Sequence, residues 1–106
     1  MKTKMQIKIF NNGLEKFIQS LEKSTIAKTL RTIDLLEKFG YDLKFPHSKK
    51  IAKNLLELRI RGRQEIRIFY TFHKSRIILL NGFVKKSRKT PQKEIKLALD
   101  FLWRLD

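Results

Sequence analysis

Apolar and polar residues alternate along several short stretches of the chain, which is typical of β-strands with one buried face. The alternation runs over residues 5–9, 56–61 and 66–72. A further stretch, 76–84, is apolar almost throughout, as in a central strand that is covered on both faces. Short turns separate the last three stretches, the first of them at Gly62, so an antiparallel meander is the most economical topology.

Three other stretches have the spacing of amphipathic helices. Apolar residues recur every three or four positions over residues 14–21, 26–36 and 95–102, and each stretch therefore presents one apolar side. Gly40 is expected to end the second helix. In the third, Thr90–Pro91 predicts the start, with the threonine as the cap and the proline in the first turn.

Residues 41–52 have no clear period, and they are predicted to form a loop between the second helix and the next strand. The predicted order of elements is therefore β-α-α-β-β-β-α. A chain of 106 residues has the size of one domain, so residues 1–106 are expected to form a single α+β domain. In that domain the helices are expected to pack on one face of a small, mainly antiparallel sheet.

The charge of the chain is strongly positive and unevenly distributed. The sequence has 25 Lys and Arg residues against 10 Asp and Glu residues, which gives a formal net charge of +15. Residues 1–48 contribute +4 of this surplus and residues 49–106 contribute +11. Such a surplus predicts a polyanionic partner, most often a nucleic acid, that binds the second half of the chain. A basic but otherwise ordinary surface, or a structural role on the ribosome, is the alternative.

The composition disfavours several other classes of protein. No apolar stretch approaches the ~18 residues that cross a bilayer, so no membrane partner is expected. No apolar stretch follows the basic residues at the start of the chain, so no signal peptide is expected. The absence of cysteine excludes disulfides and thiolate nucleophiles and agrees with a cytoplasmic location. His47 and His73 lie in predicted loops without further ligands at suitable spacing, so we expect no metal site and no cofactor.

Two arginines stand at matching positions of the first predicted hairpin. Arg59 and Arg67 are equidistant from Arg63, so their side chains should lie opposite each other on the polar face, roughly 5 Å apart at Cβ. Like charges in this position destabilise a sheet by up to about 1 kcal/mol, and an anion would relieve the repulsion. Two alternatives remain open: each arginine pairs with Glu57 or Glu65, or both belong to a solvated face.

Further cations and one ring share the polar side of these strands. Arginine suits phosphate because its planar guanidinium donates two parallel hydrogen bonds. A sheet face that carries Arg59 and Arg67, Lys85 and Lys86, and the ring of Phe69 has the chemistry of a groove for single-stranded RNA. Cations would hold the phosphates and the ring would stack on a base. For the ring, packing in the core is the alternative.

Four segments occur in an order that is specific to one group of proteins: LELRI (56–60), EIRIFY (65–70), LLNGFVKKSRKTP (79–91) and EI (94–95). Together they resemble the phage-derived, HigB-like branch of the RelE/HigB toxin superfamily; before residue 56 the resemblance is one of architecture. It implies a RelE-like fold, with two N-terminal helices packed on the sheet, and the toxin of a type II toxin–antitoxin system. Such a toxin acts as an mRNA endoribonuclease on translating ribosomes. The implied partners are mRNA, the ribosome and a cognate helix-turn-helix antitoxin.

The resemblance also implies a metal-independent reaction, in which the ribose 2'-hydroxyl attacks the adjacent phosphate. Arg67 matches the arginine that contacts this phosphate, Arg59 matches its neighbour, and Lys85 or Lys86 matches a cation that stabilises charge or donates a proton. The residues then expected to bind RNA are Lys49, Lys50, Lys53, Arg61, Phe69, Arg88 and Lys89. The C-terminal helix lacks the Tyr or His that serves some members as base or acid, so these two roles stay open.

Two other classes of function are compatible with the same residues. The chain could be a non-catalytic, basic nucleic-acid-binding module, or an inactive toxin homologue bound to an antitoxin. It could also be an interaction protein whose only partner is the antitoxin, with an acidic strip on that partner that neutralises the basic surface. A nuclease and a binding module should both lose RNA affinity as salt rises, so RNA cleavage is the observation that separates them.

Overall fold

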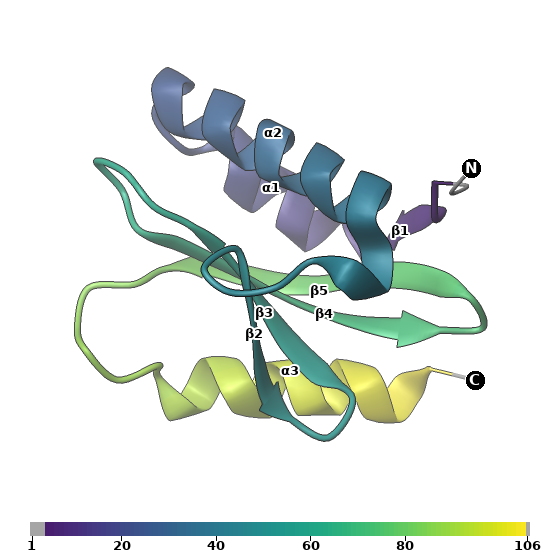
Figure 1. Ribbon diagram of the computed structural model, residues 1–106. Helices are drawn as coiled ribbons and strands as arrows, with labels where there is room; N and C mark the ends of the chain where they lie inside the picture. Colours follow the sequence, from purple (N-terminus) through teal and green to yellow (C-terminus); the bar gives the residue numbers. More distant parts are fainter. Residues whose placement is uncertain (1–3, 106) are drawn as a thin grey trace.

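The computed structural model describes residues 4–105, which form a five-stranded sheet with helices on both faces (Figure 1). The elements are β1 (Ile7–Ile9), α1 (Asn12–Gln19), α2 (Lys23–Phe39), the 3-10 turn η1 (Gly40–Asp42), β2 (Ser48–Ala52), β3 (Leu55–Ile60), β4 (Ile66–His73), β5 (Arg76–Val84) and α3 (Gln92–Arg104). The strand order in the sheet is β1-β5-β4-β3-β2. Only β1 runs parallel to its neighbour, so the predicted α+β class with a mainly antiparallel sheet is confirmed.

The central strand β5 is covered on both faces, as its long apolar run predicts. Ile77 and Leu79 pack in a core with α1 and α2, whereas Ile78 and Leu80 pack in a second core with α3. In Figure 1, α1 and α2 lie above the sheet and α3 lies below it. The prediction that all helices share one face is therefore wrong. Helical periodicity shows that a helix has an apolar side, but it does not say which face of the sheet receives that side.

Residues 41–52 are not one loop, because they contain the strand β2. This strand lies at the edge of the sheet and pairs with β3, with Lys49 opposite Glu57. The predicted order therefore lacks one strand. Lysines on an edge strand keep it from pairing with other chains, and they also remove the alternation that reveals a strand in a sequence. The buried hydroxyl of Ser48 holds β2 to the sheet through a hydrogen bond with the hydroxyl of Tyr70.

The start of α3 differs from its prediction by one residue. The helix begins at Gln92, and Pro91 stands at the cap position without a side-chain cap bond. Thr90 lies near a buried carboxylate instead, with its Oγ1 3.5 Å from Oε2 of Glu57. No helix among residues 4–105 is both long and apolar enough to cross a membrane. Residues 1–3, on which the signal-peptide prediction partly rests, and residue 106 lie outside the described part of the chain.

Candidate functional site

A groove lined mainly by cations opens at the turn end of the β3–β4 hairpin, and we call it the cationic groove. Its volume is about 540 Å³. The residues that line it are Arg59, Arg61, Glu65, Arg67, Lys85, Lys86, Ser87 and Arg88. Six of these eight are Lys or Arg and one is acidic, so the groove concentrates positive charge in a small volume. A cationic concavity of this kind attracts anions more strongly than isolated surface charges do.

Strand register brings the two arginines together. Arg59 of β3 is the direct partner of Arg67 of β4, as the predicted hairpin requires. Neighbours of both arginines along the strands, including Leu58 and Ile66, lie in the core under α1 and α2. Because successive side chains of a strand point to opposite faces, the arginines lie on the α3 side. The backbone N–H of Lys85 donates to the carbonyl oxygen of Glu65 at 2.7 Å, and this bond brings the segment after β5 to the same place.

Six of the predicted site residues thus line one groove, and the others do not. Lys49 and Lys50 lie on the edge strand β2, and Lys53 lines a separate depression near Trp103 at the other end of the sheet. Lys89 is exposed in the segment before α3 but does not line the cationic groove. None of these four lysines contributes to the walls of the cationic groove.

Phe69 was expected to stack on a base, and that prediction is wrong. Its ring is 0% exposed and packs against Phe83, with the ring centroids 5.6 Å apart, in the core under α3. Phe69 has the same strand phase as Arg67 but stands two residues farther from the turn. At that depth α3 covers the sheet, so this position belongs to the core, the alternative that the sequence left open.

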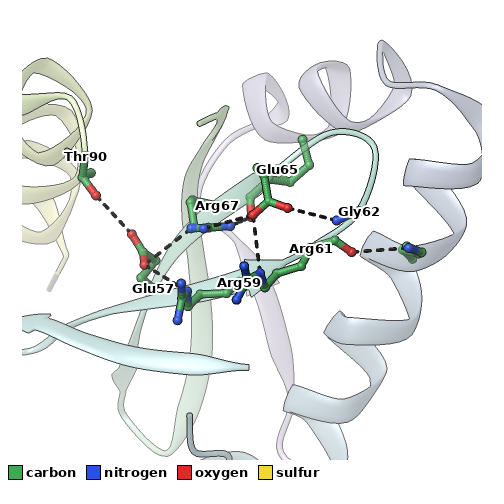
Figure 2. A network of polar contacts seen from close by, with 9 residues as sticks. Glu57, Arg59, Arg61, Gly62, Glu65, Arg67 and Thr90 are labelled. Carbon is green, nitrogen blue, oxygen red and sulfur yellow. Dashed lines mark hydrogen bonds and ion pairs between the residues drawn. The ribbon is translucent and has the colours of Figure 1, made fainter. Parts of the chain in front are cut away.

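A buried carboxylate lies between the two arginines (Figure 2). Glu57 is 3% exposed, and its Oε1 is 3.9 Å from Nε of Arg59 and 3.7 Å from Nε of Arg67. The repulsion between the arginines is therefore relieved inside the protein, without an external anion. Pairing with Glu57 and Glu65 was one of the open alternatives, and it is the arrangement found. Since a buried charge is stable only when paired, Glu57 and Arg67 need each other in the folded state.

Glu65 occupies the wall of the cationic groove between two guanidinium groups. Its Oε1 is 3.3 Å from Nη2 of Arg67 and 3.7 Å from Nε of Arg61, while its Oε2 accepts the backbone N–H of Gly62 at 3.1 Å. Burial alone would raise the pKa of this carboxyl group. The Gly62 hydrogen bond and the two arginines outweigh burial and hold the pKa of Glu65 below its usual value. The carboxylate is therefore ionised at neutral pH.

Some hydrogen-bonding capacity of the groove remains available to a ligand. This capacity does not include Arg67, because its Nη1 donates to the carbonyl oxygen of Ile66 at 2.9 Å and its Nε, which has no hydrogen-bond partner, is buried. Within residues 4–105, Lys85, Lys86 and Arg88 have no ion-pair partner. The groove thus has a paired, buried side at Arg67 and an unpaired, more exposed side after β5. An anion in the groove can therefore bind the cations after β5 directly, whereas the buried Arg67 acts on it through its charge.

The sequence indicated Glu57 and Glu65 only as alternative partners for the arginines, and it assigned Thr90 to a helix cap. The signal for the two glutamates was that each stands two residues before an arginine in an extended stretch, which places both side chains on one face. The residues that the structure describes contain no group of three His, Cys, Asp or Glu side chains that could hold a metal ion.

The family model described as Phage derived protein Gp49-like (DUF891) matches residues 16–102. Among solved structures, the chain is similar to one in the crystal structure of the archaeal RelE-RelB complex from Pyrococcus horikoshii OT3. The TM-score is 0.55 and the sequence identity 20%, over 81% of this chain and 99% of that chain. This similarity confirms the predicted RelE-like fold. No curated protein matches the sequence.

Proposed function

The chain belongs to the Gp49-like family of phage-derived proteins, and from that premise we propose that it is the toxin of a type II toxin–antitoxin pair. Its proposed activity is endonucleolytic cleavage of mRNA on translating ribosomes. One observation supports this most directly: Arg59, Arg61, Arg67, Lys85 and Lys86 meet in a single groove, although they come from three separate segments. The RelE-like fold supports the same function.

The proposed reaction needs charge stabilisation and two proton transfers. The ribose 2'-oxygen forms a bond to the adjacent phosphorus, and the bond from phosphorus to the 5'-oxygen of the next nucleotide breaks. The products are a 2',3'-cyclic phosphate and a 5'-hydroxyl. Because the phosphorane transition state carries extra negative charge, cations placed around it lower its free energy more than that of the substrate. Arg67 and Lys85 are the groups that we assign to this role.

The same groove offers groups for both proton transfers. Glu65 is the one carboxylate among the described residues that line it, and in its ionised form it can accept the proton of the 2'-hydroxyl. Lys86 is exposed at the rim and can donate a proton to the leaving 5'-oxygen. Glu57 is buried beneath the groove, so we assign it to holding Arg59 and Arg67 in place rather than to contact with RNA.

The proposed partners follow from the charge of the groove and from the structural relative. A message in the decoding site is single-stranded, so its phosphates can reach a groove in which cations come from several elements. The relative from Pyrococcus horikoshii OT3 was solved as a RelE-RelB complex, which supports an antitoxin partner for this chain. A helix-turn-helix protein that covers the cationic groove with carboxylates would neutralise the toxin.

Growth after expression without any partner tests the toxin function. We expect the wild-type protein to arrest growth, and Arg67→Ala to allow it, because a lost transition-state contact costs about 10²- to 10³-fold in rate. Arg67 is buried, so the exposed Lys86→Ala is a second groove variant that should fold normally. Arg104→Ala, on the surface of α3, is the matched control and should arrest growth like the wild type. Equal arrest by all four proteins would exclude the groove from the toxic activity.

A non-catalytic RNA-binding module, or an inactive homologue bound to an antitoxin, is the second candidate. Two observations favour it: Arg67 already has carboxylate partners, and none of the described groove residues is a histidine or tyrosine. This candidate predicts that the purified protein retards RNA in a gel without shortening it. The ribonuclease predicts new RNA ends under the same conditions, and these ends disappear with Arg67→Ala.

A further inference from the structure

A second groove adjoins the cationic groove, between α2 and the end of β3, and we call it the α2–β3 groove. Its volume is about 470 Å³, within the usual size range of ligand sites. Leu35 of α2, Pro46 of the loop before β2 and Ile60 of β3 contribute an apolar surface. Lys28 and Arg31, which are one turn apart on α2, contribute exposed cations. An apolar surface beside cations suits a ligand with flat, weakly polar rings and negative charges.

The two grooves are continuous. Arg59 and Arg61 line both of them, so they form a shared wall. Nζ of Lys28 donates to the carbonyl oxygen of Arg61 at 3.4 Å, which places a charge of α2 directly at the junction. A flexible polyanion held in the cationic groove can therefore extend into the α2–β3 groove, where Lys28, Arg31, Arg59 and Arg61 outnumber the one carboxylate of the lining, Asp34.

An exposed aromatic ring stands beside this junction. Phe45 is 69% exposed, and its ring centroid is 5.0 Å from the guanidinium carbon of Arg59. A solvent-exposed phenylalanine gains little from packing, but a ring beside an arginine is the usual stacking platform for bases of single-stranded nucleic acids. Phe45 directly precedes Pro46, so the platform and the apolar surface of the α2–β3 groove are adjacent.

We propose that the α2–β3 groove is a subsite for nucleotides of single-stranded RNA that flank the phosphate in the cationic groove. Phe45 stacks on one base, Leu35 and Pro46 contact another, and Lys28 and Arg31 pair with the intervening phosphates. The subsite rests on the proposed function insofar as RNA is the ligand, but it does not depend on cleavage. The continuity of positive charge and the ring beside Arg59 favour RNA over a protein segment in this groove.

Binding of a fluorescent nonamer RNA with 2'-O-methyl riboses tests the subsite, since such an RNA cannot undergo 2'-hydroxyl attack. We expect Lys28→Gln/Arg31→Gln to weaken binding about tenfold and to reduce the slope of log K against log salt by about 1.4. Phe45→Ala should weaken binding by a similar factor, since one lost stacking contact is worth roughly five- to 100-fold. Both variants change exposed side chains, so their thermal unfolding should resemble that of the wild type.

Matched controls separate the subsite from general charge and general aromatic exposure. Lys16→Gln/Lys38→Gln removes the same charge from exposed positions outside both grooves. Tyr41→Ala removes an exposed ring that packs on Phe72 instead of facing the junction. We expect less than a twofold change in affinity for each control. Equal effects of the groove variants and their controls would overturn the subsite.

Lys86→Ala makes failure of the subsite distinguishable from failure of the proposed function. If Lys86→Ala weakens binding and the α2–β3 variants do not, the subsite is wrong and the cationic groove stands. If the α2–β3 variants weaken binding and Lys86→Ala does not, the subsite stands and the proposed reaction site in the cationic groove is wrong. If the wild type does not bind the nonamer, both proposals fall. If the α2–β3 variants keep RNA affinity but lose neutralisation by a co-expressed antitoxin, the groove binds a protein and the subsite is overturned.

Discussion

The two faces of the β3–β4 hairpin depend on their surroundings in different ways. On one face, Leu58, Ile60 and Ile68 pack under α1 and α2 in a mainly apolar core. On the other face, near the turn, Arg59 and Arg67 share the carboxylate of Glu57. Burial of apolar groups has no directional requirement, so the first face needs only the correct alternation. A buried charge needs one particular partner at a few ångströms, and the second face therefore depends on individual residues.

The largest loss of stability is expected from the apolar face. Ile68 is completely buried, and Ile68→Ala removes three carbon atoms from the core under α1 and α2. We expect the free energy of unfolding in urea to fall by about 2–5 kcal/mol. The RNA affinity of the remaining folded protein should not change, because Ile68 is on the side away from the cationic groove. A loss below about 1 kcal/mol would mean that this face is loosely packed.

The charged face should be almost as sensitive to a change that is nearly isosteric. Glu57→Gln leaves the guanidinium of Arg67 buried with only Glu65 as an acidic partner, and should lower the free energy of unfolding by about 3 kcal/mol. The matched control is Glu22→Gln, which breaks an exposed ion pair with Arg63 and should cost under 1 kcal/mol. Similar losses for both variants, measured by urea denaturation, would show that the buried carboxylate of Glu57 stabilises the fold no more than an exposed ion pair does.

A smaller loss is expected where α1 approaches β5 on the apolar face. A Cβ atom added at Gly82 would lie 3.0 Å from Cε2 of Phe17 and 3.1 Å from Cδ1 of Leu14, closer than ordinary contact. Gly82→Ala should therefore cost about 1 kcal/mol or slightly more through overpacking. Adding Phe17→Leu should recover part of this cost, as a double-mutant cycle would show. Additive losses in the cycle would mean that the two side chains do not compete for space.

The smallest effect concerns the pH dependence of stability on the charged face. The pKa of Glu65 is below its usual value near 4.5, so ionised Glu65 stabilises the folded state above that pH. This contribution is lost as the pH falls from about 4.5 through the lower pKa of the folded state. Glu65→Gln should lack this contribution. The difference in unfolding temperature between the variant and the wild type should therefore shrink as the pH falls over this range. Because the carboxylate is 35% exposed, solvent and salt reduce the difference. A constant difference at all pH values would contradict this role.

The sequence predicted the parts of the fold that depend on periodicity. Arg59 and Arg67 were placed opposite each other because a hairpin is symmetric about its turn, and the run in β5 correctly indicated burial on both faces. The strand β2 was missed because its exposed lysines break the alternation. The position of α3 was missed because the apolar side of a helix fits either face of a sheet.

The sequence predicted the composition of the candidate site better than its boundaries. Cations on neighbouring strands were expected to meet, and those near the hairpin turn do. Phe69 was misassigned because strand phase does not reveal where α3 covers the sheet. The contact between Glu57 and Thr90 joins residues 33 positions apart, and such long-range pairs leave no local signal in a single sequence.

The chemistry of the RNA ends is the most direct test of the cationic groove as a ribonuclease site. Purified protein would be added to a translation reaction, and the new ends of the message would be mapped and identified. We predict cuts inside codons that leave a 2',3'-cyclic phosphate and a 5'-hydroxyl, no cut where the 2'-hydroxyl is replaced by hydrogen, and cleavage about 10²- to 10³-fold slower with Arg67→Ala. A message left intact by the wild-type protein, or fragments with 3'-hydroxyl and 5'-phosphate ends, would contradict this function.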